Sequence, residues 1–164
     1  MAHPKQPTGP SVQEALRQTK PFSSPGPEAV VAMLMTTERL RWPLQDMMSS
    51  RSDLTLQQYN VLRILRGAGK EGLPTLEIAS RMVERTPGIT RMIDRLQAKG
   101  YVTRERATDD RRQVRCLITA AGRKLVNSLD KPVQQLDEDL LSALTKAETK
   151  ELIRLLNKVR NSLG

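Results

Sequence analysis

The chain has 164 residues, with 27 Lys and Arg against 18 Asp and Glu, and with one Cys, one His and four aromatic side chains. This length suits one domain of ordinary size, and the scarcity of aromatic residues predicts a mainly helical core of Leu, Ile, Val, Met and Ala. The single His, His3, argues against a His-assisted catalytic site or a His-rich metal site, and one Cys excludes a disulfide within the chain. No stretch approaches ~18 consecutive apolar residues and no signal peptide is evident, so we expect a soluble cytoplasmic protein without metal or cofactor.

Residues 1–27 are expected to form a flexible arm, because they hold six of the ten prolines together with Gly and Ser. Within this arm, residues 11–18 could form a short helical turn. A single domain is expected to fill residues 28–164. Its first helix begins at Glu28, and Pro43 is expected to kink or stop that helix.

Two helices are predicted in the next part of the chain. One spans about residues 55–66, where apolar residues recur every three or four positions, and glycines end it. A shorter helix starts near Thr75, which we expect to be its N-cap.

The next predicted helix has the clearest boundaries. Thr86 is expected to be its N-cap, Pro87 its first residue and Gly100 its C-terminal stop. Its buried stripe, spaced i, i+3, i+4, i+7, consists of Ile89, Met92, Ile93 and Leu96. The opposite face carries Thr90, Arg91, Asp94 and Arg95.

Residues favourable to β-structure then replace the helical pattern. Residues 101–106 and 114–118 roughly alternate and flank a polar stretch, which predicts a two-stranded hairpin. A fifth helix, capped by Thr119, is expected to run toward Leu141 with a bend near Pro132. The last helix opens with a capping box at residues 145–148 and continues along a Leu-rich stripe.

Basic side chains are concentrated in residues 81–115, which hold ten Lys and Arg against five Asp and Glu; nine of the ten are Arg. Arg suits bidentate contact with phosphate or guanine, although a run of charge can also be a plain solvated face. A short helix, a turn, a second helix with a polar N-terminus and an Arg-tipped hairpin together describe a winged helix-turn-helix. In that arrangement the second helix enters the major groove of DNA, and the hairpin reaches the minor groove.

Residues 76–119 resemble the DNA-binding lobe of MarR-family transcriptional regulators. The resemblance rests on Thr86-Pro-Gly-Ile-Thr-Arg-Met-Ile-Asp-Arg-Leu96, Lys99-Gly-Tyr-Val-Thr-Arg104, Asp110-Arg-Arg112 and Ile118-Thr119. It extends over roughly residues 28–162, with a DNA-binding lobe at about 54–119 and dimerisation helices at about 28–50 and 120–162. It implies a homodimeric repressor that binds a pseudo-palindromic operator in double-stranded DNA and is released by a small, often aromatic, effector.

The resemblance also implies roles for single side chains. Residues expected to contact DNA are Thr86, Pro87, Gly88, Thr90, Arg91, Arg95, Arg111 and Arg112, with one of the last two in the minor groove. Asp110 would hold the wing in shape through an ion pair. Arg95 could instead form a structural ion pair with Asp94 or Asp110.

Other interpretations stay open at this stage. Trp42 and Tyr59 could line an effector pocket, or belong to the core. Cys116 alternates with apolar strand residues, so we expect burial rather than redox sensing. The arm's Lys5, Arg17 and Lys20 could follow DNA phosphates or only be disordered.

Three other classes of protein are alternatives to a sequence-specific regulator. A non-specific architectural DNA-binding protein would use the same basic surface for electrostatics alone. A dimeric interaction module would tolerate loss of the arginines. An enzyme is rejected, because the sequence offers no nucleophile–base pair, phosphate-binding Gly loop or ligand cluster.

Overall fold

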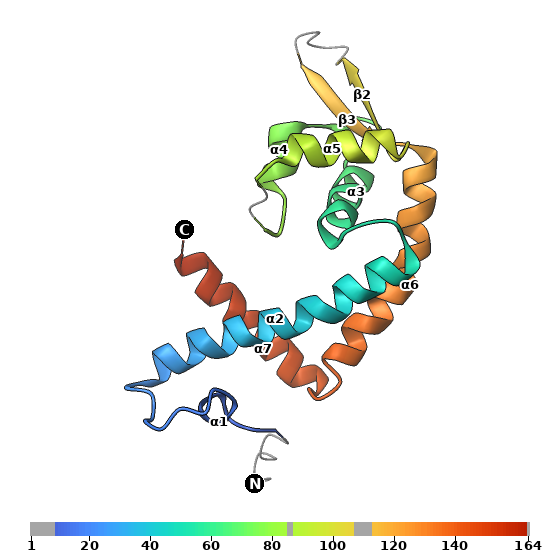
Figure 1. Ribbon diagram of the computed structural model, residues 1–164. Helices are drawn as coiled ribbons and strands as arrows, with labels where there is room; N and C mark the ends of the chain where they lie inside the picture. Colours follow the sequence, from blue (N-terminus) through green and yellow to red (C-terminus); the bar gives the residue numbers. More distant parts are fainter. Residues whose placement is uncertain (1–8, 85–86, 107–112, 164) are drawn as a thin grey trace. The chain divides into compact units, whose positions relative to one another are not determined.

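The computed structural model describes residues 9–84, 87–106 and 113–163 (Figure 1). The helices are α1 (Val12–Ala15), α2 (Pro25–Arg51), α3 (Leu56–Ala68), α4 (Thr75–Ser80), α5 (Ile89–Ala98), α6 (Ala120–Leu140) and α7 (Lys146–Ser162). The strands are β1 (Leu73–Pro74), β2 (Val102–Arg106) and β3 (Val114–Ile118). This confirms a mainly helical fold with a small antiparallel sheet. Among the described residues, no helix is both long and apolar enough to cross a membrane.

The chain divides into two compact units between Pro43 and Leu44. In the first unit, the expected helical turn is confirmed as α1. Its Ser11 N-cap accepts from the Glu14 N–H at 3.2 Å, and the Glu14 carboxylate accepts from the Ser11 N–H at 2.7 Å. The hydrogen bond from the Ser11 backbone is the main reason that the pKa of Glu14 is lowered.

Helix α2 begins at Pro25, three residues before the expected start, and it does not end at Pro43. A proline inside a helix removes one N–H donor, but its fixed φ is compatible with helical backbone. The helix therefore continues through this position to Arg51. Of the two effects expected of Pro43, a kink or a stop, the stop is wrong.

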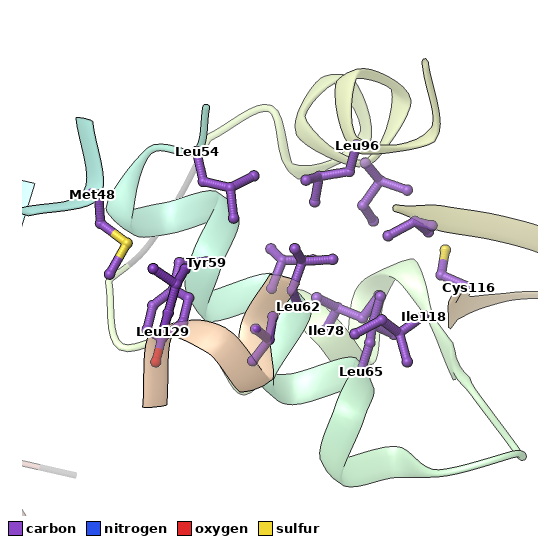
Figure 2. Packing of buried hydrophobic residues seen from close by; sticks show 14 of the residues in the cluster. Met48, Leu54, Tyr59, Leu62, Leu65, Ile78, Leu96, Cys116, Ile118 and Leu129 are labelled. Atoms are coloured by element: carbon purple, nitrogen blue, oxygen red, sulfur yellow. The ribbon is translucent and has the colours of Figure 1, made fainter. Parts of the chain in front are cut away.

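The core of the second unit is built around α3 (Figure 2). Its Leu62 and Leu65 are completely buried, together with Ile78 of α4 and Leu96 of α5. Across the core, α6 is held to α3 by Arg66, which donates to both Asp130 carboxylate oxygens at 2.7 and 3.0 Å and to Asn127 at 2.8 Å. The core thus fixes α3, α4, α5 and α6 in one body.

The sheet has three strands in the order β1-β3-β2, where the sequence predicted a two-stranded hairpin. The hairpin of β2 and β3 is confirmed, with Val102 opposite Ile118 and Arg104 opposite Cys116. The additional strand β1 pairs Leu73 with Cys116. Two residues are too few to show an alternating pattern, so β1 is visible only in three dimensions.

Side-chain caps confirm three of the expected helix starts. Thr55, Thr119 and Thr145 each accept a backbone N–H three residues on. Thr75 is different: it is the first residue of α4, whose N-cap is Pro74, so its expected capping role is wrong. Its hydroxyl instead lies 3.8 Å from the Sγ of Cys116, which is completely buried as expected.

Replacing Gly122 with alanine is expected to destabilise the fold by about 1–3 kcal/mol, the usual cost of overpacking. An added Cβ would lie 2.4 Å from the Tyr101 carbonyl oxygen and 3.0 Å from Cγ1 of Ile118, where α6 crosses the hairpin. Gly67→Ala in α3 is the matched control, because its Cβ meets nothing within 4 Å. That control should be neutral or stabilising, since alanine favours helix. Equal urea unfolding midpoints for the two variants would contradict the prediction.

Candidate nucleic-acid interface

Helix α5 starts and ends sharply, but its start differs from the one expected. Gly88, with φ 85°, is the N-cap and Ile89 the first helical residue, so Pro87 lies in the preceding turn and not in the helix. The end is as predicted. Gly100, with φ 74°, donates to the Gln97 carbonyl at 2.9 Å, and the Tyr101 N–H donates to the Leu96 carbonyl at 2.9 Å. These two bonds form a Schellman motif, which needs left-handed backbone at Gly100.

The two faces of α5 differ as the sequence predicted. Ile93 and Leu96 are completely buried, and Ile89 and Met92 pack against the same core. The side chains of Thr90, Arg91 and Arg95 are exposed. Burial of one face therefore fixes which side chains the helix presents to a partner.

The other predicted DNA contacts fall into two groups. Pro87 and Gly88 are exposed immediately before Thr90 and Arg91, so these four lie together at the N-terminal end of α5. Thr86, Asp110, Arg111 and Arg112 lie outside the described residues.

The base of the wing is attached to α5 by Arg104 of β2. Its guanidinium lies 2.6 Å from Oδ1 of Asp94 and donates to Oε1 of Gln97 at 3.1 Å. The hydrogen bond to Asp94 is the main reason that the pKa of Arg104 is raised. Asp94 thus pairs with Arg104 of the wing strand and not with Arg95. The ion pair between Arg95 and Asp94 that the sequence allowed is therefore wrong. Arg95 makes no ion pair with any described residue.

Removing the Asp94 charge with Asp94→Asn is expected to weaken DNA binding and to cost about 0.5–1 kcal/mol of stability, because both side chains are partly exposed. A double-mutant cycle with Arg104→Gln, read by urea unfolding, measures the coupling. The matched cycle uses Glu151 and Arg154, an ion pair of 2.7 Å within α7. Coupling at Asp94 no larger than in this local pair, with DNA affinity unchanged, would contradict the prediction.

The C-terminal end of α5 has a second attachment, which the sequence did not predict. The Lys99 ammonium lies 3.1 Å from Oδ2 of Asp53 and also donates to the Asp53 carbonyl, and the Tyr101 hydroxyl donates to Oδ1 of Asp53 at 3.2 Å. Burial opposes ionisation of Asp53, but Lys99 and Tyr101 outweigh it, and its pKa is lowered. These bonds join the end of α5 to the loop before α3. No local pattern could predict them, because Asp53 and Lys99 are far apart in the sequence.

A cavity of about 210 Å³ lies beside α3. Its walls come from the end of α2, from α3, from residues 82–84 and from α6. Tyr59 lines it and also belongs to the buried core, so both interpretations of this side chain stay open; burial raises the pKa of this phenol. Trp42 belongs to the first unit and is 73% exposed.

Two side chains of α3 hold the segment that leads into α5. The Gln57 amide donates to Oε2 of Glu84 at 3.4 Å, and the Asn60 amide donates to Sδ of Met82 at 3.8 Å. All four side chains line the cavity. The cavity wall and the approach to α5 are therefore the same segment. Over the part of the chain that the structure describes, no group of three His, Cys, Asp or Glu side chains could hold a metal ion.

Comparison with known proteins agrees with this geometry. The family model of the MarR family matches residues 54–114. The chain is 41% identical to a MarR transcription factor from Planctomyces limnophilus, over 84% of this chain and 98% of the other, with a TM-score of 0.61. It is 28% identical over 110 residues to the transcriptional regulator HosA of Escherichia coli O157:H7, covering 67% of this chain and 80% of HosA.

A third similarity concerns a complex with DNA. A mutant MarR from E. coli, solved with operator DNA, is 30% identical, over 78% of this chain and 90% of the other, with a TM-score of 0.69. Transcription factors of this family are not enzymes. Because the similarity covers nearly the whole of a solved relative at 41% identity, this chain belongs to the MarR family of DNA-binding transcriptional regulators.

Proposed function

We propose that this chain is a cytoplasmic, homodimeric repressor that binds a pseudo-palindromic operator and is released by a small effector. The observation that carries the proposal is the exposed N-terminal end of α5, where Pro87, Gly88, Thr90 and Arg91 lie together. Small residues there allow close approach to DNA, and a recognition helix contacts base edges through its first turns. Arg111 and Arg112, outside the described residues, are proposed to complete the site in the minor groove.

Homodimer formation is supported by the apolar face of α7. None of its residues is buried, and its large apolar side chains are 36–54% exposed. These are Leu152, Ile153, Leu155, Leu156 and Val159. An exposed apolar stripe of this length on one helix is typical of a surface that a partner covers. A second copy related by two-fold symmetry would also match a palindromic operator.

Effector response is supported by the cavity beside α3. It is enclosed mainly by apolar side chains, as ligand sites are. Its wall includes Met82 and Glu84, a few residues before the recognition helix begins at Ile89. A ligand that binds only one arrangement of this segment would shift the equilibrium between DNA-binding and released states.

The test is fluorescence anisotropy of the full chain on fluorescent DNA from upstream of its own gene. A sequence-specific regulator should retain this fragment against excess unrelated DNA, because specific binding is typically ~10³–10⁷ tighter. Loss of the fragment to unrelated DNA, followed by failure to enrich any sequence in a genome-wide selection, would favour the architectural DNA-binding protein instead. Sedimentation equilibrium tests the dimer, and a monomer at micromolar concentration would contradict it.

A further inference from the structure

The charged side chains of the cavity point to the chemical class of its ligand. Two carboxylates line it, Asp137 on α6 and Glu84 before α5, against one guanidinium, that of Arg63 on α3. We propose that the cavity binds a small apolar cation, such as a protonated aromatic amine, rather than an aromatic carboxylate. This inference rests on the effector response proposed above.

The guanidinium of Arg63 already contacts an aromatic ring of the same helix. The Arg63 side chain lies over the ring of Tyr59, 5.7 Å from its centroid, where the π-electrons attract a cation. Asp137, by contrast, makes no hydrogen bond or ion pair with any described residue. A carboxylate beside apolar walls, with capacity to accept hydrogen bonds, is complementary to an ammonium group on an apolar ligand.

The size and lining of the cavity suit one ring with a short side chain. An apolar cavity of about 150 Å³ is enough for benzene, and this one measures about 210 Å³. Leu44, Leu56 and Val133 supply apolar walls from three different segments. The ring would pack among these side chains while the ammonium faces the carboxylates.

Glu84 gives such a ligand a route to the recognition helix. Its contact with Gln57 is a long one, 3.4 Å, between a neutral amide and a carboxylate. A charged donor forms a shorter bond, roughly twice as strong. An ammonium that binds Glu84 would share the carboxylate that Gln57 contacts, on the segment that precedes α5. The ligand would weaken DNA binding by changing how this segment is held.

Three probes of matched size test the charge preference: benzylamine, benzyl alcohol and benzoate. Each is titrated into ¹⁵N-labelled full chain and followed by NMR. We expect benzylamine to shift the amides of Leu56, Asn60 and Val83, and to bind about fivefold more tightly than benzoate, the scale of a partly exposed charge pair. Tighter binding of benzoate, equal binding of all three probes, or no shift at these amides would overturn the inference.

A matched pair of variants locates the charge responsible. Asp137→Asn should remove most of the benzylamine preference, whereas Asp139→Asn, the same change on α6 outside the cavity lining, should keep it. Equal effects of the two variants would overturn the assignment to Asp137. Adding benzylamine to the complex with retained upstream DNA should lower its anisotropy. If DNA is retained but does not respond, the effect of the ligand on DNA binding is ruled out and the regulator stands. If neither the upstream fragment nor a genome-wide selection yields retained DNA, the proposed function fails while the NMR titration still decides the ligand class.

Discussion

Replacing Arg91 with alanine is expected to weaken operator binding about 5- to 150-fold per half-site, the range that corresponds to 1–3 kcal/mol for a good base contact. Arg91 is exposed in the first turn of α5, on the face opposite Ile93 and Leu96. Alanine cannot form a bidentate hydrogen bond with guanine, so the preference for that base should disappear as well. Anisotropy titrations at fixed salt on the operator and on an unrelated duplex measure both effects.

The comparison duplex makes the assignment to base readout testable. Removing a base-reading side chain lowers operator affinity more than affinity for unrelated DNA, whereas removing a phosphate-binding side chain lowers both alike. Lys131→Ala, which removes an exposed cation from α6, is the charge control and should change neither affinity by more than about twofold. If Arg91→Ala behaves like this control, the proposed role of Arg91 in DNA binding is wrong.

Replacing Gly72 with alanine is expected to destabilise the second unit by about 2–4 kcal/mol, combining an unfavourable positive φ with overpacking. Gly72 has a φ of 61°, and an added Cβ would lie 2.6 Å from the Cys116 carbonyl oxygen and 2.8 Å from Cγ of Leu117. Because the Cys116 carbonyl belongs to the backbone, this steric clash can be relieved only if β1 and β3 move apart. Urea unfolding followed by circular dichroism measures the destabilisation.

Gly100→Ala separates the two contributions at Gly72. Gly100 also has a positive φ, 74°, but its added Cβ would meet nothing within 4 Å. It should therefore show only the conformational cost, about 1 kcal/mol. If Gly72→Ala costs no more than Gly100→Ala, the close approach of β1 to β3 does not limit stability.

The parts of the fold that could be predicted are those encoded locally. Thr119 and Thr145 are followed by helical patterns, and Gly100 follows an apolar stripe, so each boundary is visible within a few residues. The exposed face of α5 also follows from spacing alone, because Ile93 and Leu96 determine which side is buried.

The features that could not be predicted depend on distant partners or on backbone geometry. Strand β1 exists because Leu73 pairs with Cys116, far along the chain, and Asp53 acquires its role only when Lys99 and Tyr101 reach it. Asp94 had a sequence neighbour of opposite charge, Arg95, but adjacent helical residues point in different directions. The nearer cation in space is Arg104, on another element.

The short connection between α5 and β2 has a consequence for the DNA sequence itself. Only residues 99–101 separate helix from strand, and the Schellman motif and the Asp94–Arg104 ion pair hold them together. In the proposed complex, this joint between α5 and the wing would restrict the number of base pairs between the major-groove and minor-groove contacts of a half-site. One inserted pair would move the second contact by about 3.4 Å along the duplex. In the proposed complex, spacing inside a half-site would depend on this joint, and spacing between half-sites on the proposed dimer.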